Sequence, residues 1–298
     1  MEAKKKQNKN IYISSEEVKG RIPFDDSPAK VYIMNHIIEM TIMEKKRKKG
    51  CAIRRLKHGY YLVESTGEIK KCKAKGDGEK EVNMNAKFSA LRRLIEYNFR
   101  GYNSEIHLTL TYGKEMRDRE KASSDFKAFW KHLRFYNQNL EYIVIYEPTK
   151  KGSWHMHVLV KDVQNRALYI SRVLLEKIWK KGYVFVTKMK NNDNIGAYFM
   201  ALISVDKDNP KSKGKAERLK FYTKGYRLYS RSKGILEPRC IETTYAEAKK
   251  LVEGLEPCYE KNYGIYSTDD DRELNVIYHK QYNKKRPAGK LEKNNGQA

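Results

Sequence analysis

The 298-residue chain lacks several features that define common classes of protein. It has no apolar run approaching the ~18 residues that a membrane-spanning helix needs. Its first residues, MEAKKKQNKN, contain no apolar core of a signal peptide. The four cysteines form no CxxC pair, which argues against a zinc ribbon and a disulfide scaffold. From these absences we expect a cytoplasmic protein in a reducing compartment, with no membrane partner.

Acidic residues are scarce relative to basic ones. The chain has 62 Lys and Arg against 37 Asp and Glu, which gives a net charge of +25, and it has 22 tyrosines. Basic side chains gain affinity for phosphates by releasing counterions, and aromatic rings stack on bases. Nucleic acid is therefore the predicted partner, and an anionic membrane surface is the weaker alternative.

Alternating and helical apolar patterns are clearest in the middle of the chain. They predict strands over 106–112, 141–147, 153–160 and 183–188, and helices over 85–99, 123–137, 171–181 and 195–205. Ser123 or Ser124 is the expected cap of the second helix. This order predicts an α+β fold, in which a central antiparallel sheet carries helices packed on one face.

The flanks divide the chain into three expected regions. Residues 1–84 form a basic N-terminal extension of uncertain fold that begins as a mobile arm, and residues 85–205 form the central domain. Residues 206–298 form a basic C-terminal extension with a helix over 245–253, a hairpin of 258–266 with 273–282, and a disordered tail from Lys284.

The sharpest local feature is His155-Met156-His157, in the strand expected over 153–160. Residues i and i+2 of a strand face the same side, about 7 Å apart. Two imidazoles on one rigid surface can hold a metal ion, whereas Met156 points the other way, into the core. Two half-buried strand histidines without a ligand would show the same spacing, so this spacing leaves both interpretations open.

Glu147 favours the metal interpretation. It lies eight residues before His155, at the end of the preceding expected strand. Pairing of the two strands as a hairpin would bring its carboxylate near both imidazoles. Such a set leaves open positions for water and a phosphate oxygen, and Mg²⁺ or Mn²⁺ would suit catalysis on phosphate. Taken alone, an acid at a strand end is usually solvated.

Tyr198 lies in the helix expected over 195–205, within NIGAYFMAL. A tyrosine hydroxyl has a pKa of about 10 and needs a metal-bound phosphate or a nearby base to become an effective nucleophile. A tyrosine on an apolar helix is more often a core residue, so the pattern alone leaves both roles open.

Together these motifs resemble the HUH endonuclease superfamily, in particular the rolling-circle replication-associated (Rep) proteins of bacterial plasmids and phages. The resemblance covers roughly residues 85–240. IHLTLTY is similar to the first motif of that superfamily, EPTKKGSWHMHVLV to the second and NIGAYFMAL to the third. The segment KGYRLYSRSKGILEP resembles the one that follows the catalytic domain. The order of the motifs is that of replication initiators, since conjugative relaxases place the tyrosine first.

The resemblance implies an HUH catalytic domain over 85–205 with a ferredoxin/RRM-like arrangement. It places Glu147, His155 and His157 as ligands of a divalent ion and Tyr198 as the nucleophile. The implied activity is nicking and rejoining of single-stranded DNA at a replication origin, through a 5′-phosphotyrosine intermediate.

One position departs from the third motif of these proteins. The superfamily usually carries a lysine three residues after the tyrosine, where this chain has Ala201. Lys188 or Lys190, at the end of the preceding expected strand, is the candidate for the missing charge.

Residues 206–233 hold ten Lys and Arg against three acids. This segment predicts a DNA-contact surface, although a solvated linker would have the same composition. The predicted contacts are Lys220, Lys224, Arg227 and Arg231. The chain has no G-x-x-x-x-G-K-[ST] loop and so no fused P-loop helicase. A host helicase and polymerase are therefore expected partners.

Two other functions stay open at this point. The first is a DNA-binding protein on a decayed HUH domain, such as a replication repressor. The absence of the lysine favours it, and the retained candidate ligands and tyrosine disfavour it. The second is a tyrosine transposase of the same superfamily, whose chains are usually shorter and lack long flanks.

Overall fold

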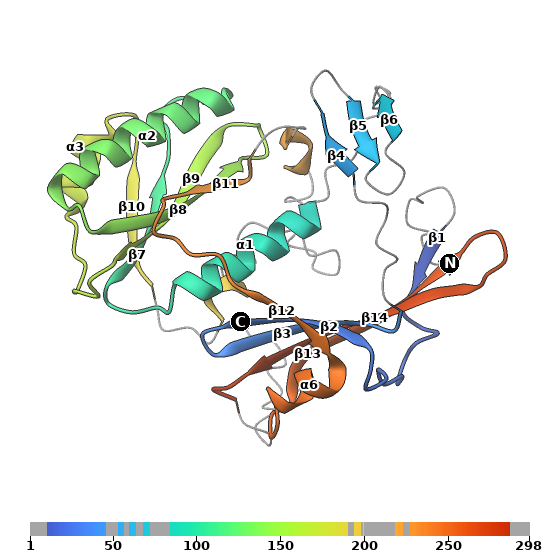
Figure 1. The fold of residues 1–298 in the computed structure, drawn as a ribbon. Helices are drawn as coiled ribbons and strands as arrows, with labels where there is room; N and C mark the ends of the chain where they lie inside the picture. The colour runs from blue at the N-terminus through green and yellow to red at the C-terminus, as the bar shows by residue number, and fades with distance from the viewer. Residues whose placement is uncertain are drawn as a thin grey trace.

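The strands in the described part of the chain form three antiparallel sheets, seen in a computed structural model (Figure 1). The structure describes residues 11–45, 53–56, 60–63, 68–71, 84–189, 194–197, 199, 218–222 and 227–286. The smallest sheet has the order β4-β5-β6, with β4 (Ile53–Arg55), β5 (Tyr60–Val63) and β6 (Glu68–Lys71). None of the helices in these ranges is long and apolar enough to cross a membrane.

A five-stranded sheet occupies the middle of the chain and has the order β10-β7-β9-β8-β11. Its strands are β7 (Glu105–Leu110), β8 (Leu140–Pro148), β9 (Trp154–Asp162), β10 (Val184–Lys188) and β11 (Tyr229–Arg231). The strand that carries the two predicted histidines is β9, which is interior as expected. The α+β fold with a central antiparallel sheet is therefore confirmed, and β11 adds an edge strand that no local pattern indicated.

Helices cover both faces of this sheet, so the expectation of one covered face was wrong. α2 (Arg119–Tyr136) lies on the face of Tyr146, whose ring meets Phe126 edge-on at 6.4 Å between ring centroids. α3 (Arg172–Trp179) lies beside α2 and β10. α1 (Met84–Asn98) covers the opposite face, where Lys161 of β9 donates to the carbonyl of Asn98. The histidine strand is therefore enclosed from both sides.

The start of α2 differs from the expected one. The carboxylate of Asp118 accepts hydrogen bonds from the backbone N–H groups of Glu120 and Lys121, and so caps the helix. Ser123 and Ser124, the predicted caps, lie inside the helix instead. An acidic side chain at this end satisfies free N–H groups and also opposes the positive end of the helix dipole, which explains the earlier start.

A six-stranded sheet is built from the two flanks of the chain and has the order β1-β13-β14-β3-β2-β12. Its strands are β1 (Ile11–Ser14), β2 (Pro28–Met34), β3 (Ile37–Met43), β12 (Cys240–Thr244), β13 (Pro257–Ser267) and β14 (Glu273–Asn283). The predicted late hairpin is β13 with β14. α6 (Tyr245–Lys250) packs on one face over a second apolar core that includes Val31, Met40 and Tyr278. Strands from both predicted extensions thus share one sheet.

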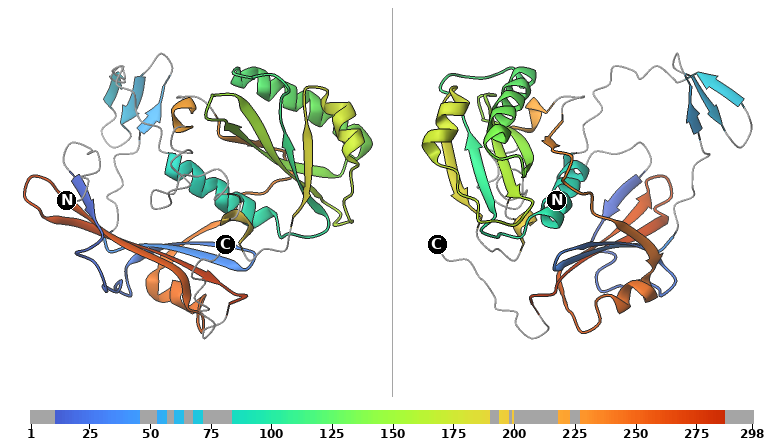
Figure 2. Two further views of the ribbon diagram at one scale, coloured as in Figure 1. Left: turned by 180° about the vertical axis from the view of Figure 1, so that it is seen from behind. Right: turned by 60° about the vertical axis from the view of Figure 1, so that its left-hand side comes forward.

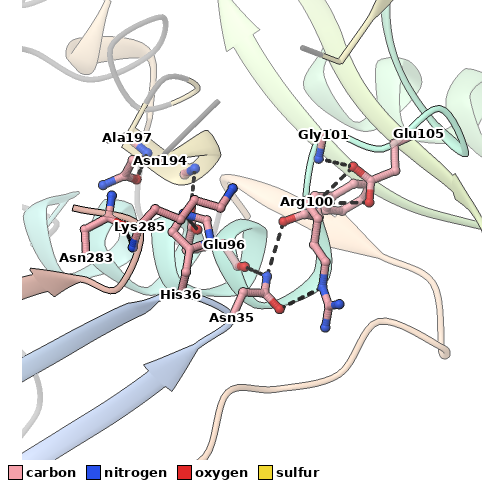
Figure 3. A network of polar contacts seen from close by, with 12 residues as sticks. Asn35, His36, Glu96, Arg100, Gly101, Glu105, Asn194, Ala197, Asn283 and Lys285 are labelled. Carbon is pink, nitrogen blue, oxygen red and sulfur yellow. Dashed lines mark hydrogen bonds and ion pairs between the residues drawn. The ribbon is translucent and has the colours of Figure 1, made fainter. Parts of the chain in front are cut away.

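α1 lies between the two larger sheets in the views of Figures 1 and 2. Its residues Arg92 and Arg93 pair with Glu39 of β3, which ties the helix to the six-stranded sheet. At its C-terminal end, Asn35 of the β2–β3 turn donates to the carbonyl of Glu96 and accepts from Arg100 (Figure 3). The helix therefore joins the two parts of the molecule through polar contacts as well as packing.

The same helix holds the segment that begins at Asn194. The backbone N–H of Gly196 donates to Glu96 Oε2 at 2.9 Å. A Cβ added at Gly196 would lie 2.6 Å from the carbonyl oxygen of Arg92, so the close approach to α1 requires glycine. Phe199 then reaches the five-stranded sheet, where its ring meets that of His107 at 5.0 Å. This packing brings the segment to the histidine face of the sheet.

Candidate metal centre

Glu147, His155 and His157 converge on one face of the β8–β9 hairpin. The register places Glu147 directly opposite His155, and the side chains of alternate residues on β9 point to the same face. Glu147 Oε2 lies 3.0 Å from His155 Nε2 and 2.9 Å from His157 Nε2. Met156 is fully buried on the other face. The pairing of two neighbouring strands thus creates the cluster.

The carboxylate of Glu147 is buried but ionised. Burial raises the pKa of this group, and the hydrogen bonds from His155 and His157 outweigh that effect and lower the pKa to about 2. Both rings therefore present an Nε2–H to the same oxygen. The negative charge of Glu147 thus lies between two imidazoles and is buried from solvent.

His107 of β7 adds a third ring to this cluster, and the sequence analysis missed it. Its Nε2 lies 3.1 Å from His157 Nδ1, and the two rings stack at 5.3 Å between centroids. Burial, with the nearby His157 as a smaller cause, lowers the pKa of His107 to about 3, so this ring is neutral. A neutral imidazole donates through one nitrogen and accepts through the other, so His107 can complete the hydrogen bonding of either His157 tautomer.

The alternating pattern of IHLTLTY is the sequence feature that could have identified His107. His107 and Thr109 are two residues apart on β7, and Thr109 pairs with His157 in register. The side chains of both therefore had to face the same side as His157 once β7 was placed beside β9. That neighbour relation is a long-range pairing, which the local pattern did not reveal.

The donor set of the cluster fits a divalent cation. Each of the three residues offers one ligand atom, and these atoms all lie within 4.8 Å of one another. Two imidazole nitrogens with one carboxylate oxygen suit a first-row divalent ion and leave positions for other ligands. The buried Nδ1 of His155 has no hydrogen-bond partner in the described part of the chain, so only the Nε2 of this ring is hydrogen-bonded there.

Arg218, also missed from the sequence, completes the surroundings of Glu147. It precedes the short 3₁₀ helix η3 (Leu219–Phe221), and its Nη1 contacts Glu147 Oε1. The two oxygens of one carboxylate thus serve different partners, with Oε2 facing the imidazoles and Oε1 the guanidinium. Arg218 lies in the basic segment 206–233, but composition alone did not distinguish it from the other cations there.

The other predicted residues are distributed as follows. Tyr198, Lys190 and Lys224 lie outside the residues that the structure describes, as does Ala201. Lys188 is exposed at the end of β10, and Lys220 is exposed with its Nζ 5.2 Å from the ring of Phe221. The backbone carbonyl of Arg227 accepts from Arg119, and Arg231 pairs with Glu237. Their roles as nucleophile or DNA contacts stay predictions.

A family match covers the stretch of the chain that contains this cluster. Residues 105–207, about a third of the chain, match the model of a family of replication-associated proteins, the ORF2 type. All three candidate ligands lie inside the matched stretch, and the match supports a replication-associated protein. Searches of curated proteins and of solved structures gave no match.

Proposed function

We propose that this protein initiates rolling-circle DNA replication as a metal-dependent endonuclease of the HUH type. The observation that carries the proposal is the convergence of Glu147, His155 and His157 on two adjacent interior strands, inside the stretch that matches a replication-associated family. Such a cluster would hold Mg²⁺ or Mn²⁺. When bound, the ion would polarise a phosphate and offset charge that develops on it.

Each residue of the proposed site would have a different role. Glu147 stays ionised and supplies the negative ligand, the two imidazoles supply neutral ligands, and His107 orients His157. The proposed nucleophile is Tyr198, whose hydroxyl oxygen would attack a phosphorus of single-stranded DNA. The phosphorus–3′-oxygen bond breaks as the tyrosine–phosphorus bond forms. The released 3′-OH can prime synthesis, and the retained phosphoester bond permits later rejoining.

The substrate would be single-stranded DNA at a replication origin, in keeping with the net charge of +25. Lys188, Lys190, Lys220, Lys224, Arg227 and Arg231 are the proposed phosphate contacts. A host helicase would open the duplex and a host polymerase would extend the 3′-OH. Binding that is dominated by phosphate contacts should weaken steeply as the salt concentration rises. For single strands, a plot of log K against log salt concentration should fall with a slope of about 0.7 for each phosphate contact.

The decisive experiment looks for a covalent adduct. The protein is incubated with Mn²⁺ and a pool of single-stranded oligonucleotides, and we expect a protein–DNA band that survives denaturing electrophoresis. Tyr198→Phe keeps the ring but deletes the attacking oxygen, so it should bind DNA and form no adduct. Tyr183→Phe is the matched control, since Tyr183 is an exposed tyrosine before β10, and it should form the adduct as the parent does.

Two outcomes would change the conclusion. An adduct of parental yield with Tyr198→Phe would exclude this tyrosine as the nucleophile. No adduct with the parent on any single-stranded substrate, together with tight DNA binding, would favour the DNA-binding protein without catalysis. In that case the alanine at position 201 would be the first position to convert to lysine.

A further inference from the structure

The guanidinium of Arg218 is only partly used by the protein. Its Nη1 contacts Glu147, whereas its Nε is buried and has no hydrogen-bond partner among the described residues. The Nη2 likewise makes no hydrogen bond within the ranges that the structure describes. The edge formed by Nε and Nη2 is the planar fork with which arginine binds two oxygens of a phosphate. The unused donors are therefore those that suit an oxyanion.

The position of Arg218 is built into the fold. Two residues after η3 begins, the ring of Phe221 packs against the β8–β9 turn so closely that a Cβ on Gly152 would lie 2.7 Å from it. Gly152 also has φ +84°, which favours glycine. Tyr222 then donates from its hydroxyl to the carbonyl of Tyr146 at 3.0 Å. These contacts, made by neighbours of Arg218, hold its backbone beside the hairpin without the help of its own side chain.

The charges around the cluster also favour binding of an anion together with a divalent ion. Glu147 contributes one negative charge and Arg218 one positive charge, so this contacting pair is balanced. A divalent ion added to this set would leave an excess of two positive charges in a place where the carboxylate is only 4% exposed. Excess charge of this kind is costly in a partly desolvated site unless an anion accompanies it.

We propose that the Nε–Nη2 edge of Arg218 is a phosphate-binding subsite that holds a phosphodiester group of single-stranded DNA next to the metal cluster. Arg218 is then a substrate-binding residue, whose Nη1 contacts Oε1 of Glu147 and leaves Oε2 to the cluster. This inference rests on the proposed function, because it takes DNA as the ligand and the cluster as the metal site.

The test compares two kinds of binding in the full-length protein. The affinity for a fluorescent thymidine oligonucleotide is measured by anisotropy without divalent ions, and the affinity for Mn²⁺ is measured by calorimetry. Arg218→Gln removes the charge and the fork, whereas Arg218→Lys keeps the charge next to Glu147 and removes only the fork. Lys151→Gln, in the exposed β8–β9 turn, is a control for the loss of one positive charge.

We expect both Arg218 variants to lose about tenfold or more in oligonucleotide affinity, within the range of one good bidentate contact. Lys151→Gln should lose about twofold at most. The Mn²⁺ affinity of Arg218→Gln should equal or exceed that of the parent, since a neighbouring cation has been removed. Thermal unfolding of each variant shows whether it is folded, and Arg218→Lys keeps the ion pair with Glu147.

Three results would overturn the proposal: parental oligonucleotide affinity in Arg218→Lys, a loss in Arg218→Gln no larger than in Lys151→Gln, or a fall in Mn²⁺ affinity without any loss of oligonucleotide affinity. Failure of the proposed function would look different. In that case the parent forms no covalent adduct or binds no Mn²⁺, while the oligonucleotide comparison without metal remains interpretable.

Discussion

Two buried carboxylates, one in each large sheet, are surrounded in opposite ways. Glu39 of the six-stranded sheet gives one oxygen to each of two guanidiniums, with Arg93 Nε 2.8 Å from its Oε1 and Arg92 contacting its Oε2. Glu147 of the five-stranded sheet turns one oxygen to two imidazoles and the other to Arg218. The first cluster is satisfied by its own partners, and the second leaves donors and acceptors unused.

The difference separates a structural ion pair from a binding site. Around Glu39 each carboxylate oxygen has a guanidinium partner, and one positive charge is left over at a partly exposed junction. Around Glu147 there are a buried Nδ1 on His155 and a buried Nε on Arg218 without partners in the described residues. Buried polar atoms are nearly always hydrogen-bonded, so unpaired ones beside convergent ligands point to a missing ligand. Variants of each cluster should therefore affect different properties.

The largest effect is expected from His157→Ala. Removal of one of three ligands should weaken Mn²⁺ binding by more than about 1,000-fold, since outer partners alone are worth 10–100-fold. The free energy of unfolding should change by about 1 kcal/mol, because the side chain is only half-buried. Calorimetric titration with Mn²⁺ measures the first and urea unfolding the second. His279→Ala, a half-buried histidine of the other sheet, should bind Mn²⁺ as the parent does; equal affinity in both variants would remove His157 from the site.

Glu39→Gln should show the reverse pattern. It leaves two arginines without their carboxylate in a junction where their side chains are only 23% and 21% exposed. We expect a loss of about 3 kcal/mol in the free energy of unfolding, with unchanged Mn²⁺ affinity. Glu242→Gln, which alters the exposed pair with Lys30 in the same sheet, should cost less than about 1 kcal/mol. A weakened Mn²⁺ site in Glu39→Gln would contradict the separation of the two clusters.

Glu96, at the junction of the two parts, predicts a dependence on pH. Burial raises its pKa to about 7, although the Gly196 N–H, Arg92 and Lys285 lower it in part. The folded protein thus holds a proton that the unfolded chain releases near pH 4.5, so this group lowers the free energy of unfolding as pH rises from about 4.5 to 7.

Glu96→Gln removes this ionisation and keeps an oxygen for the Gly196 N–H. The variant should be more stable than the parent by about 3 kcal/mol above pH 7, and the difference should shrink towards pH 4.5. Urea unfolding at pH 5 and pH 8 measures it. An equal difference in the free energy of unfolding at both pH values would show that burial does not raise the pKa of the Glu96 carboxyl.

The smallest effect is expected from His107→Phe. The phenyl ring preserves packing against Phe199 but cannot hydrogen-bond His157 Nδ1, while Thr109 Oγ1 remains 3.4 Å from that nitrogen. Mn²⁺ affinity should fall by about tenfold. Parental affinity in the calorimetric titration would mean that Thr109 alone suffices to orient the ligand.

The sequence revealed what depends on near neighbours along the chain. The helix of α1, the hairpin of β8 with β9 and the convergence of Glu147 with the two histidines follow from periodicity and a short turn. Arg218 and His107 escaped detection because their places beside Glu147 and His157 depend on contacts 71 and 50 residues apart. Local propensity carries no information about such pairings.

The six-stranded sheet could not be predicted from local sequence patterns for the same reason. β3 pairs with β14, and β1 with β13, across almost the whole chain. No alternation within residues 31–43 identifies a partner beyond residue 270. The start of α2 differs less from its prediction. Asp118 caps this helix in place of Ser123 or Ser124.

The distance between β3 and β14 has a consequence for synthesis of the protein on the ribosome. β3 ends at Met43 and β14 begins at Glu273, so 273 − 43 = 230 residues must be added before the partner strand emerges. At about 5–20 residues per second this takes roughly 10–50 s. Four strands of the five-stranded sheet are complete by Lys188, so that sheet can assemble while both edges of the nascent β2–β3 hairpin are still exposed. A ribosome that stops between residues 232 and 272 therefore releases a chain with a formed candidate site, an unpaired β3 edge and a second core that lacks Val276, Tyr278 and Tyr282.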